Sequence, residues 1–375
     1  SDPSSPRAVI DATRTLHVFW GGGNRTLRHA FVPLSQAEFP RAWSAPVSIA
    51  QALPASHDAI VSADGVMLVA YTDGADGSVR LLTSVDLGQT WSEPATVAIP
   101  ESGVAAGDVR MASGADGTLH VVWTEYTLPD GWPPSGAFYS RSIDGGRTWT
   151  RKLQVAPAGH GQIGIATGAG DAVHLVWRST IGGDGTLHQV SSDGGLTWDI
   201  PDRSDDRGGF SGLPSFARSS DDALHLVVGR GFYANWADGK ISGYQDVITP
   251  AVRALAKLSD GEQALLVSTS GNRLHVVFEL EFQSIWYTSL DLNLPPLPTV
   301  TPLARESSAA GLSERDTGLV QITPTTVALR EADQTSGGAP ATGRPSGLPL
   351  LAGLVPVLVI IGLAVALTAR HNGPW

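Results

Sequence analysis

Three short stretches of the chain follow one pattern, S-x-D-x-G-x-T-W. Its fixed residues are Ser84, Asp86, Gly88, Thr90 and Trp91 in the first copy, Ser142, Asp144, Gly146, Thr148 and Trp149 in the second, and Ser191, Asp193, Gly195, Thr197 and Trp198 in the third. Glycine supplies the positive φ of a tight turn, and aspartate accepts hydrogen bonds from the amides of the turn itself. The tryptophan that follows can fold its ring back over the hairpin. The pattern therefore predicts three β-hairpins of one construction.

A second repeat extends over more of the chain and sets the number of units. Short apolar runs, most of them with histidine in second place, end at residues 20, 71, 123, 177, 228 and 278, so the repeat is 50 to 54 residues long. The runs are Leu16–Trp20, Met67–Tyr71, Leu119–Trp123, Val173–Trp177, Leu224–Val228 and Leu274–Phe278. Units of this length are typical of β-propellers, whose blades are four-stranded sheets around an axis.

Each unit divides into strands in the same way. In the third unit we expect strands near Asp108–Ser113, Leu119–Trp123, Ala137–Arg141 and Arg151–Val155, with the turn pattern between the last two. The second strands are nearly continuous apolar runs, as expected where neighbouring blades cover both faces. We therefore predict an all-β domain over residues 1–330, a six-bladed β-propeller of four-stranded antiparallel blades.

Five of the ten histidines occupy one repeated position, at His17, His120, His174, His225 and His275. Equivalent positions on successive blades fan around the axis and do not converge, so these rings are predicted to pack between blades. The chain has no cysteine and no H-E-x-x-H spacing, which removes the strong sequence signals for zinc. We predict no metal and no cofactor.

The end of the chain carries a long uncharged segment. Leu348–Ala369 is 22 residues long, which gives a helix of about 33 Å against a hydrocarbon core of about 30 Å. We predict a single transmembrane α-helix there, preceded by a Gly-, Pro-, Ser- and Thr-rich stalk at 331–347 and followed by a short tail at 370–375. A buried core helix is the alternative, and the length of the segment disfavours it.

Composition bears on the compartment and on partners. The net charge of −11 disfavours nonspecific binding to DNA or other polyanions, and we predict no nucleic-acid partner. Lysine occurs only at Lys152, Lys240 and Lys257, a skew toward arginine compatible with a GC-rich bacterial genome. The chain begins Ser1-Asp2-Pro3, without a visible export signal, as expected for a mature chain whose signal peptide has been removed. We therefore expect the propeller on the extracytoplasmic side of the cell membrane.

The three S-x-D-x-G-x-T-W stretches resemble the Asp-box, or BNR, repeats of the sialidase superfamily, whose catalytic domains are six-bladed propellers. The resemblance implies that each Asp-box lies between the third and fourth strands of a blade, away from the substrate-binding mouth. Asp-box propellers also include other glycosidases, receptor ectodomains and assembly factors. The resemblance therefore predicts the scaffold and leaves the activity open.

The resemblance also suggests which residues to examine at the mouth. Sialidases clamp a substrate carboxylate with three arginines, and they use a tyrosine nucleophile, its glutamate partner and an aspartate acid/base. Arg178 looks like the family arginine that ends the second strand of a central blade. The division into blades places the ligand-binding candidates Arg7, Arg110, Arg178, Arg230, Asp108, Glu125 and Tyr126 on this face, together with Asp58, His160, Glu279 and Glu281. Trp132, in the loop at 126–136, is a further recognition candidate, with capping of its own blade as the alternative.

The chain also departs from the sialidase pattern. The aromatic-Arg-Ile-Pro signature is absent, and residues 260–272 hold no tyrosine where the nucleophile is expected. If the protein is an enzyme, Asp73 and Asp76 are the candidate acids. The leading hypothesis is a membrane-anchored module that binds a glycan or a protein partner. The alternatives are a divergent exo-sialidase or other glycoside hydrolase acting on cell-surface or extracellular glycans, and a purely structural subunit.

Overall fold

The computed structural model describes most of the first 203 residues and a series of shorter segments beyond them. The described residues are 4–22, 26–37, 39–51, 56–179, 185–203, 214–218, 223–228, 232–237, 240–241, 245–246, 265–269, 273–280, 284–291 and 355–356. Their regular structure is β-strand apart from two single-turn 3-10 helices, η1 (Leu34–Gln36) and η2 (Pro40–Ala42). The all-β prediction is confirmed for this part of the chain.

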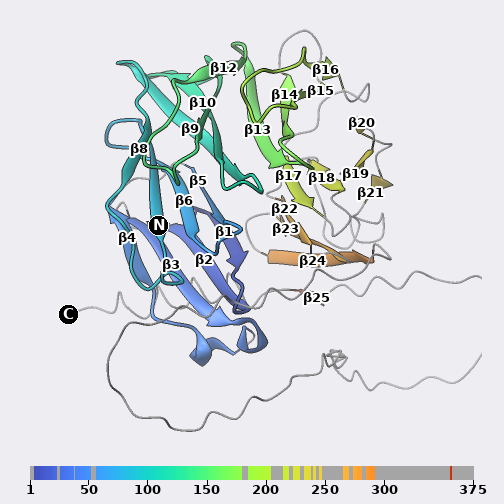
Figure 1. The fold of residues 1–375 in the computed structure, drawn as a ribbon. Coiled ribbons are helices and arrows are strands. Elements are labelled where there is room, and N and C mark those ends of the chain that lie inside the picture. Colours follow the sequence, from blue (N-terminus) through green and yellow to red (C-terminus); the bar gives the residue numbers. More distant parts are fainter. Residues whose placement is uncertain are drawn as a thin grey trace, which may run out of the picture. The chain divides into compact units, whose positions relative to one another are not determined.

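The described strands form six antiparallel sheets, each built from strands that are consecutive in the chain except at one place (Figure 1). We number the sheets in chain order. Sheet 1 contains β1 (Ser4–Ile10), β2 (Thr15–Gly22), β3 (Thr26–Pro33) and β4 (Val47–Gln51). Sheet 2 contains β5 (His57–Val61), β6 (Met67–Thr72), β7 (Val79–Ser84) and β8 (Ala95–Ala98). Sheet 3 contains β9 (Val104–Ser113), β10 (Leu119–Thr127), β11 (Gly136–Ser142) and β12 (Leu153–Ala156).

The remaining three sheets follow the same plan. Sheet 4 contains β13 (His160–Thr167), β14 (Val173–Ser179), β15 (Gly185–Ser191) and β16 (Asp202–Arg203). Sheet 5 contains β17 (Ser215–Arg218), β18 (Leu224–Val228), β19 (Phe232–Ala237), β20 (Lys240–Ile241) and β21 (Gln245–Asp246), and sheet 6 contains β22 (Leu265–Thr269), β23 (Arg273–Leu280), β24 (Ser284–Asp291) and the distant β25 (Val355–Pro356). Among the described strands, five of the six sheets have four strands, as predicted, and sheet 5 has five because β20 and β21 both pair with β19.

The first strand of each sheet packs on the first strand of the next sheet, from β1 through β5, β9, β13 and β17 to β22. This is the packing expected when first strands surround an axis and fourth strands lie outside. The second strands of sheets 1 to 4 are covered on both faces, and all six residues of β6 are buried. Trp20, Trp123 and Trp177 end the apolar runs of β2, β10 and β14 and are almost fully buried. Trp123 and Trp177 pack between neighbouring sheets, whereas Trp20 packs among residues of sheet 1 and its 3-10 segment.

Each Asp-box connects the third and fourth strands of its sheet, as the family resemblance implies, and its polar residues hold the turn together. The serine hydroxyl donates to the aspartate at 2.7 to 2.8 Å and accepts the N–H of the pattern's glycine at 2.7 to 2.9 Å. The same aspartate accepts the N–H of the pattern's threonine at 2.9 Å and its hydroxyl at 2.5 to 2.6 Å. These bonds lower the pKa of each Asp-box aspartate, so its carboxylate stays charged near neutral pH.

The glycine of each Asp-box lies against the third strand of the preceding sheet. A Cβ on Gly88 would lie 2.6 Å from the His29 ring, and a Cβ on Gly195 would overlap the hydroxyl of Tyr139. Gly146 meets Leu81 in the same way. His29, Leu81 and Tyr139 face equivalent register positions in β2, β6 and β10. One contact is therefore repeated between successive sheets, and it requires glycine for space as well as for its positive φ.

The tryptophan of the Asp-box reinforces this contact. Trp91 packs edge-on against His29 and Phe19 of sheet 1, with ring centroids 5.6 and 5.7 Å apart. Trp198 packs edge-on against Tyr139 of sheet 3 at 5.0 Å. The guanidinium of Arg141 in sheet 3 also donates to the carbonyl of Gly194 at 2.8 Å. The Asp-box therefore joins its own sheet to the one before it.

The repeated histidines His17, His120, His174 and His225 are buried. For His17 a neighbouring sheet is close, because a Cβ on Gly88 of sheet 2 would lie 3.5 Å from its ring. The side chain of His275 lies outside the described residues, and packing of all five between sheets stays a prediction. The His17 ring contacts the His29 ring at 3.0 Å and the Asp11 carboxylate at 3.2 Å. Across the described residues, no group of three or more potential metal ligands comes together.

The predicted stalk and tail lie outside the described residues, and so does nearly all of the predicted transmembrane segment. Val355 and Pro356 are the exception, and they pair as β25 with Tyr287 and Trp286 of β24. In the part of the chain that the structure describes, no helix is long and apolar enough to cross a membrane. The transmembrane helix therefore stays a prediction.

The contact between Gly195 and Tyr139 yields a matched pair of variants. Gly195→Ala should lower the free energy of unfolding by about 2 to 4 kcal/mol, because it combines a strained positive φ with overpacking. Gly194→Ala has a similar φ, but its Cβ would only touch Arg141 at an ordinary 3.4 Å, so about 1 to 2 kcal/mol is expected. Urea unfolding measures both, and equal losses would show that the contact between sheets contributes little.

The buried histidines predict a loss of stability in acid. Burial lowers the pKa of His29, His57 and His188 to about 3 and of His120 and His174 to about 4. The unfolded chain, with histidine pKa values near 6.5, then binds more protons than the folded protein below that pH. Stability should be nearly constant above pH 7 and fall between pH 6.5 and 4, by about 1.4 kcal/mol per pH unit for each histidine.

A variant taken from the repeat itself tests this origin. His29→Leu places at this position the residue that Leu81 provides in sheet 2. The slope of unfolding free energy against pH between 4 and 6 should then decrease by about one proton, or about 1.4 kcal/mol per pH unit. An acid-unfolding midpoint and slope identical to those of the unchanged protein would contradict the assignment.

Candidate functional site

Charged and aromatic side chains gather at the end of the sheets opposite the Asp-boxes, where first strands begin and second strands end. We call this end the mouth and define it by Arg7, Asp58, Asp108, Arg110 and Tyr126. Arg7 lies in β1, Asp58 in β5, Asp108 and Arg110 in β9, and Tyr126 near the end of β10. The structure thus brings together four of the predicted ligand-binding residues with one, Asp58, that was not among them.

Strand register explains why Arg7, Asp58 and Arg110 meet. Arg7 pairs with Phe19, Asp58 with Ala70 and Arg110 with Val122, and these three partners hold the same place in the repeated apolar run. The three charged residues therefore occupy one equivalent position on three successive first strands. Gly164 and Ser215 hold this position in sheets 4 and 5. Because the register is identical in the three sheets, residues about 50 positions apart in the chain lie in one row, and their charges alternate in sign.

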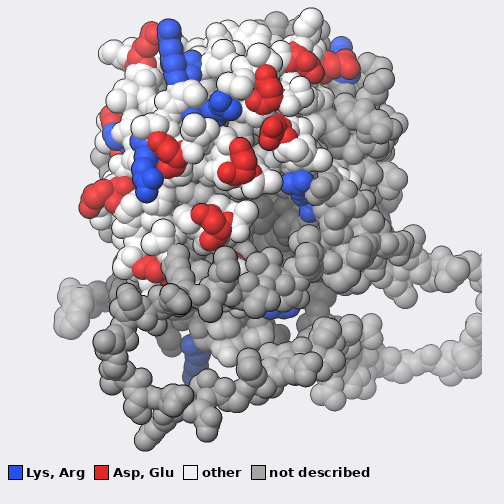
Figure 2. Space-filling model, in the orientation of Figure 1, with Lys and Arg blue, Asp and Glu red and all other residues white. Residues whose placement is uncertain are grey.

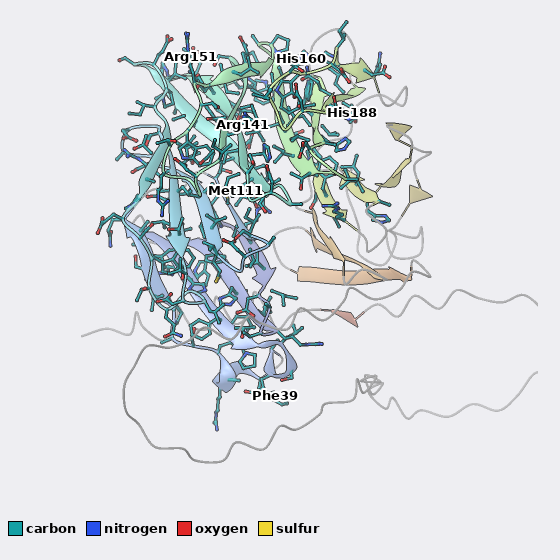
Figure 3. All side chains as sticks on the ribbon, in the orientation of Figure 1. Phe39, Met111, Arg141, Arg151, His160 and His188 are labelled. Atoms are coloured by element: carbon teal, nitrogen blue, oxygen red, sulfur yellow. The ribbon has the colours of Figure 1, made fainter. Side chains whose placement is uncertain are left out.

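Asp58 is the centre of this row. Its Oδ1 lies 3.4 Å from Nε of Arg7, and its Oδ2 accepts the backbone N–H of Met111 at 2.9 Å. Met111 is labelled in Figure 3, in β9. Arg7 Nε also donates to the carbonyl of His57 at 3.3 Å. Asp58 therefore links the first strands of sheets 1, 2 and 3 and fixes the Arg7 guanidinium.

Arg110 is the charge in this row that lacks an ion-pair partner. It is only 7 % exposed, and its Nη1 donates to the carbonyl of Val109 at 2.6 Å. Among the described residues no carboxylate lies within 4 Å of its guanidinium. Burial and the neighbouring Arg7 lower the pKa of Arg110 to about 10, while Asp58 and Asp108 act in the opposite direction. A buried guanidinium of this kind favours an anionic ligand.

Asp108 lies beside the row on a bulge of β9. Its backbone has φ of +47°, and the pairing of β9 with β10 shifts register at this point. Its carboxylate accepts the hydroxyl of Tyr126 at 2.6 Å and that of Thr124 at 3.1 Å. Burial and the Asp108 charge raise the pKa of Tyr126, so the phenol stays protonated. Gln162 repeats the bulge in β13 with φ of +55°. A bulge changes the direction in which a side chain leaves the strand, and the Asp108 bulge turns its carboxylate toward Tyr126 at the mouth.

Glu125 is committed to its own sheet. It is 4 % exposed, Lys152 contacts both of its carboxylate oxygens at 2.7 and 2.8 Å, and Trp123 Nε1 donates to it at 3.1 Å. The Lys152 ammonium also lies 4.5 Å from the centre of the Phe138 ring. Of the predicted mouth residues, Glu125 is therefore the one whose charge is already matched inside sheet 3.

The other predicted residues take varied places. Arg178 lies in β14 and pairs with Gly161 of β13, at the same end of its sheet as the mouth. Arg230 is outside the described residues. Asp73 and Asp76, the candidate acids, lie in the turn between β6 and β7. Asp73 accepts the N–H of Ala75 and Asp76 that of Ser78, each at 2.9 Å, and Arg80 pairs with Asp76 at 2.6 Å. Both carboxylates thus shape this turn.

Trp132 stands in the loop that joins β10 and β11. Its side chain is 61 % exposed, and Leu128 of the same loop is 54 % exposed. An exposed indole at this level does not serve as a cap over its own sheet. Figure 2 shows acidic and basic side chains interspersed over the visible face of the described residues. The buried Arg110 guanidinium at the mouth has the charges of Arg7, Asp58 and Asp108 as its neighbours.

Sheets of this kind, with Asp-box turns at one end and a charged mouth at the other, define a β-propeller-type protein of the sialidase-like class. Residues 14–293 match the family of the BNR repeat-like domain. The chain belongs to this BNR repeat-like family. A comparison with curated proteins found no match.

Solved structures of the same fold include enzymes and a lectin. A polysaccharide lyase, an ulvan lyase bound to -[GlcA(1-4)Rha3S]-, is 13 % identical over 76 % of this chain and 78 % of its own, with a TM-score of 0.51. An Aleuria aurantia lectin with Fucα1-6GlcNAc is 14 % identical over 80 % and 97 %, with a TM-score of 0.51. A Fusarium graminearum α-L-arabinofuranosidase with arabinobiose is 13 % identical over 78 % and 93 %, with a TM-score of 0.53. At such identities the likeness shows the fold alone.

The sequence places Asp58 on the mouth face but does not make it a ligand-binding candidate. The segment Ser56-His57-Asp58-Ala59 lacks the arginine of the family signature, so it does not predict the ion pair that Asp58 forms with Arg7. The usable signal was the repeat: Asp58 lies 12 residues before Ala70, as Arg7 lies 12 before Phe19 and Arg110 lies 12 before Val122. Alignment on the apolar runs would have placed all three in one row.

Proposed function

We propose that the protein is a six-bladed propeller that binds acidic glycans at its mouth. In this proposal the six sheets close into a ring, with the first strand of sheet 6 beside that of sheet 1. The bound group is a carboxylate or sulfate of a sugar, held by Arg110 with help from Arg7. An experimental structure in which β22 and β1 lie apart would contradict the ring.

The observation that carries the proposal is the state of the Arg110 guanidinium. It is buried, its pKa is lowered, and its one hydrogen bond is to the neighbouring backbone. An anionic oxygen from a ligand would supply the missing partner, and a charge-assisted hydrogen bond of this kind contributes about 1.5 to 3 kcal/mol. The hydroxyl of Tyr126 and the carboxylates of Asp58 and Asp108 lie close enough to address sugar hydroxyls around it.

The related folds support a saccharide as the ligand class. The ulvan lyase, the lectin and the arabinofuranosidase are all described in complex with saccharides, and in the lyase the saccharide contains glucuronate. Ligand sites of β-propeller and barrel folds lie preferentially at their mouths. A carbohydrate is therefore the favoured ligand class, and the local charge of Arg110, not the net charge of −11, would hold its acid group.

Binding of acidic glycans should depend on Arg110. On an array of sialylated, uronate-containing, sulfated and neutral glycans, the purified full chain should retain the acidic members. Arg110→Gln should weaken this binding about 10- to 100-fold, the equivalent of one charge-assisted hydrogen bond. Arg151→Gln, at an exposed arginine just before β12, is the matched control and should bind normally. Retention of no glycan, or equal binding by Arg110→Gln, would contradict the proposal.

A glycoside hydrolase is the second candidate, because the Tyr126 hydroxyl donates to the Asp108 carboxylate at 2.6 Å. A tyrosine nucleophile requires such a base to take its proton. The raised pKa of Tyr126 favours binding without turnover. The same glycans, recovered after incubation, distinguish the two functions. Intact glycans indicate a binding module, whereas cleavage that is lost in Tyr126→Phe assigns hydrolysis.

The proposal places the propeller on the extracytoplasmic face of a membrane, tethered by residues 348–369, and in the inserted helix Val355 and Pro356 would no longer pair with β24. The 22 uncharged residues of this segment are its support. The full chain should sediment with membranes, whereas a chain that ends at Gly347 should stay in the supernatant. Equal distribution of the two chains would contradict the tether.

A further inference from the structure

The loop between β10 and β11 carries an exposed aromatic side chain on a firmly held backbone. Exposed fractions of 61 % for Trp132 and 54 % for Leu128 leave both apolar groups open to solvent. At its start the loop is bound by Leu128 N–H to the carbonyl of Gly103, and at its end by Ser135 N–H to the carbonyl of Glu125, at 2.8 and 2.7 Å. Gly131 N–H closes its middle onto the carbonyl of Thr127 at 2.8 Å.

The loop also bridges two sheets at the mouth. Pro134 accepts the N–H of Gly159 at 2.8 Å, and its ring would lie 3.0 Å from a Cβ on Gly161 in the first strand of sheet 4. Gly161 pairs with Arg178 in β14. At its other end the loop begins directly after Tyr126 and Thr127, next to the Tyr126 contact with Asp108. The loop that carries Trp132 therefore runs from the Tyr126 contact with Asp108 to the end of sheet 4 that carries Arg178.

A held, exposed indole fits one kind of ligand surface particularly well. The C–H face of a pyranose ring is apolar and flat, and stacking on it needs little loss of side-chain entropy when the loop is already ordered. Arg110 is buried at the first strands, whereas Trp132 stands out in the loop. A sugar ring whose acid group binds Arg110 would not cover the exposed Trp132, so the indole would be open to stack on the neighbouring ring of the same oligosaccharide.

We propose that Trp132 forms a second subsite, which stacks on the ring adjacent to the acidic sugar, so that the protein recognises oligosaccharides of two or more rings. This inference rests on the proposed glycan binding at Arg110. It predicts selectivity: the single acidic sugar uses Arg110 alone, whereas an oligosaccharide gains affinity from both subsites.

The test compares matched short and long probes by calorimetric titration of the full chain. The probes are glucuronate with hyaluronan tetrasaccharide, and N-acetylneuraminate with sialyllactose. Trp132→Ala should weaken binding of the longer probe about tenfold and leave that of the monosaccharide within about twofold. Trp132→Phe should retain most of the affinity. Phe39→Ala is the control, because it removes an aromatic side chain that is 56 % exposed. Phe39 lies far from His160, which is next to the loop contact at Gly161 (Figure 3). This variant should change the binding of neither the short nor the long probes.

The outcomes separate this inference from the function on which it rests. Unchanged binding of the longer probes by Trp132→Ala overturns the second subsite, and so does an equal loss for short and long probes. If Arg110→Gln loses both classes of probe in the same experiment, the acidic-glycan site itself stands. Binding of none of the four probes by the unchanged protein overturns both proposals.

Discussion

The packing of each Asp-box glycine and tryptophan against the preceding sheet is the contact on which the rest of the structure depends. A four-stranded sheet of this size cannot bury both of its faces alone. The turn at Gly195 and Trp198 covers Tyr139 of sheet 3, and the turn at Gly88 and Trp91 covers His29 of sheet 1. The polar residues of the pattern hold each turn in the one shape that allows this close approach.

This arrangement also decides where the proposed ligand site lies. Because the Asp-boxes occupy one end of the sheets, the loops free to vary lie at the other end, together with the start of every first strand. Uniform register there aligns Arg7, Asp58 and Arg110 in a row. The bulge at Asp108 turns a further carboxylate toward Tyr126. Scaffold and site are thus two consequences of one repeat.

The fold was far more predictable than the site. Strands of the third unit were expected near Asp108–Ser113 and Leu119–Trp123, and they occur as the longer β9 and β10. These predictions worked because burial and turn chemistry are local properties that recur every 50 to 54 residues. Glu125 and Asp58 show the limit. Pattern alone placed Glu125 at the mouth, and only the contact with Lys152 shows that its charge is already matched.

By itself the sequence determined the all-β class, the repeating sheet and the end of each sheet that carries the Asp-box, because period and turn residues act within a few positions of one another. Tertiary structure decided which charges are matched and which are not. Asp58 pairs with Arg7, 51 residues away, while the buried Arg110 keeps an unmatched charge. Such outcomes depend on distances between sheets and on burial, and neither is encoded within a single repeat.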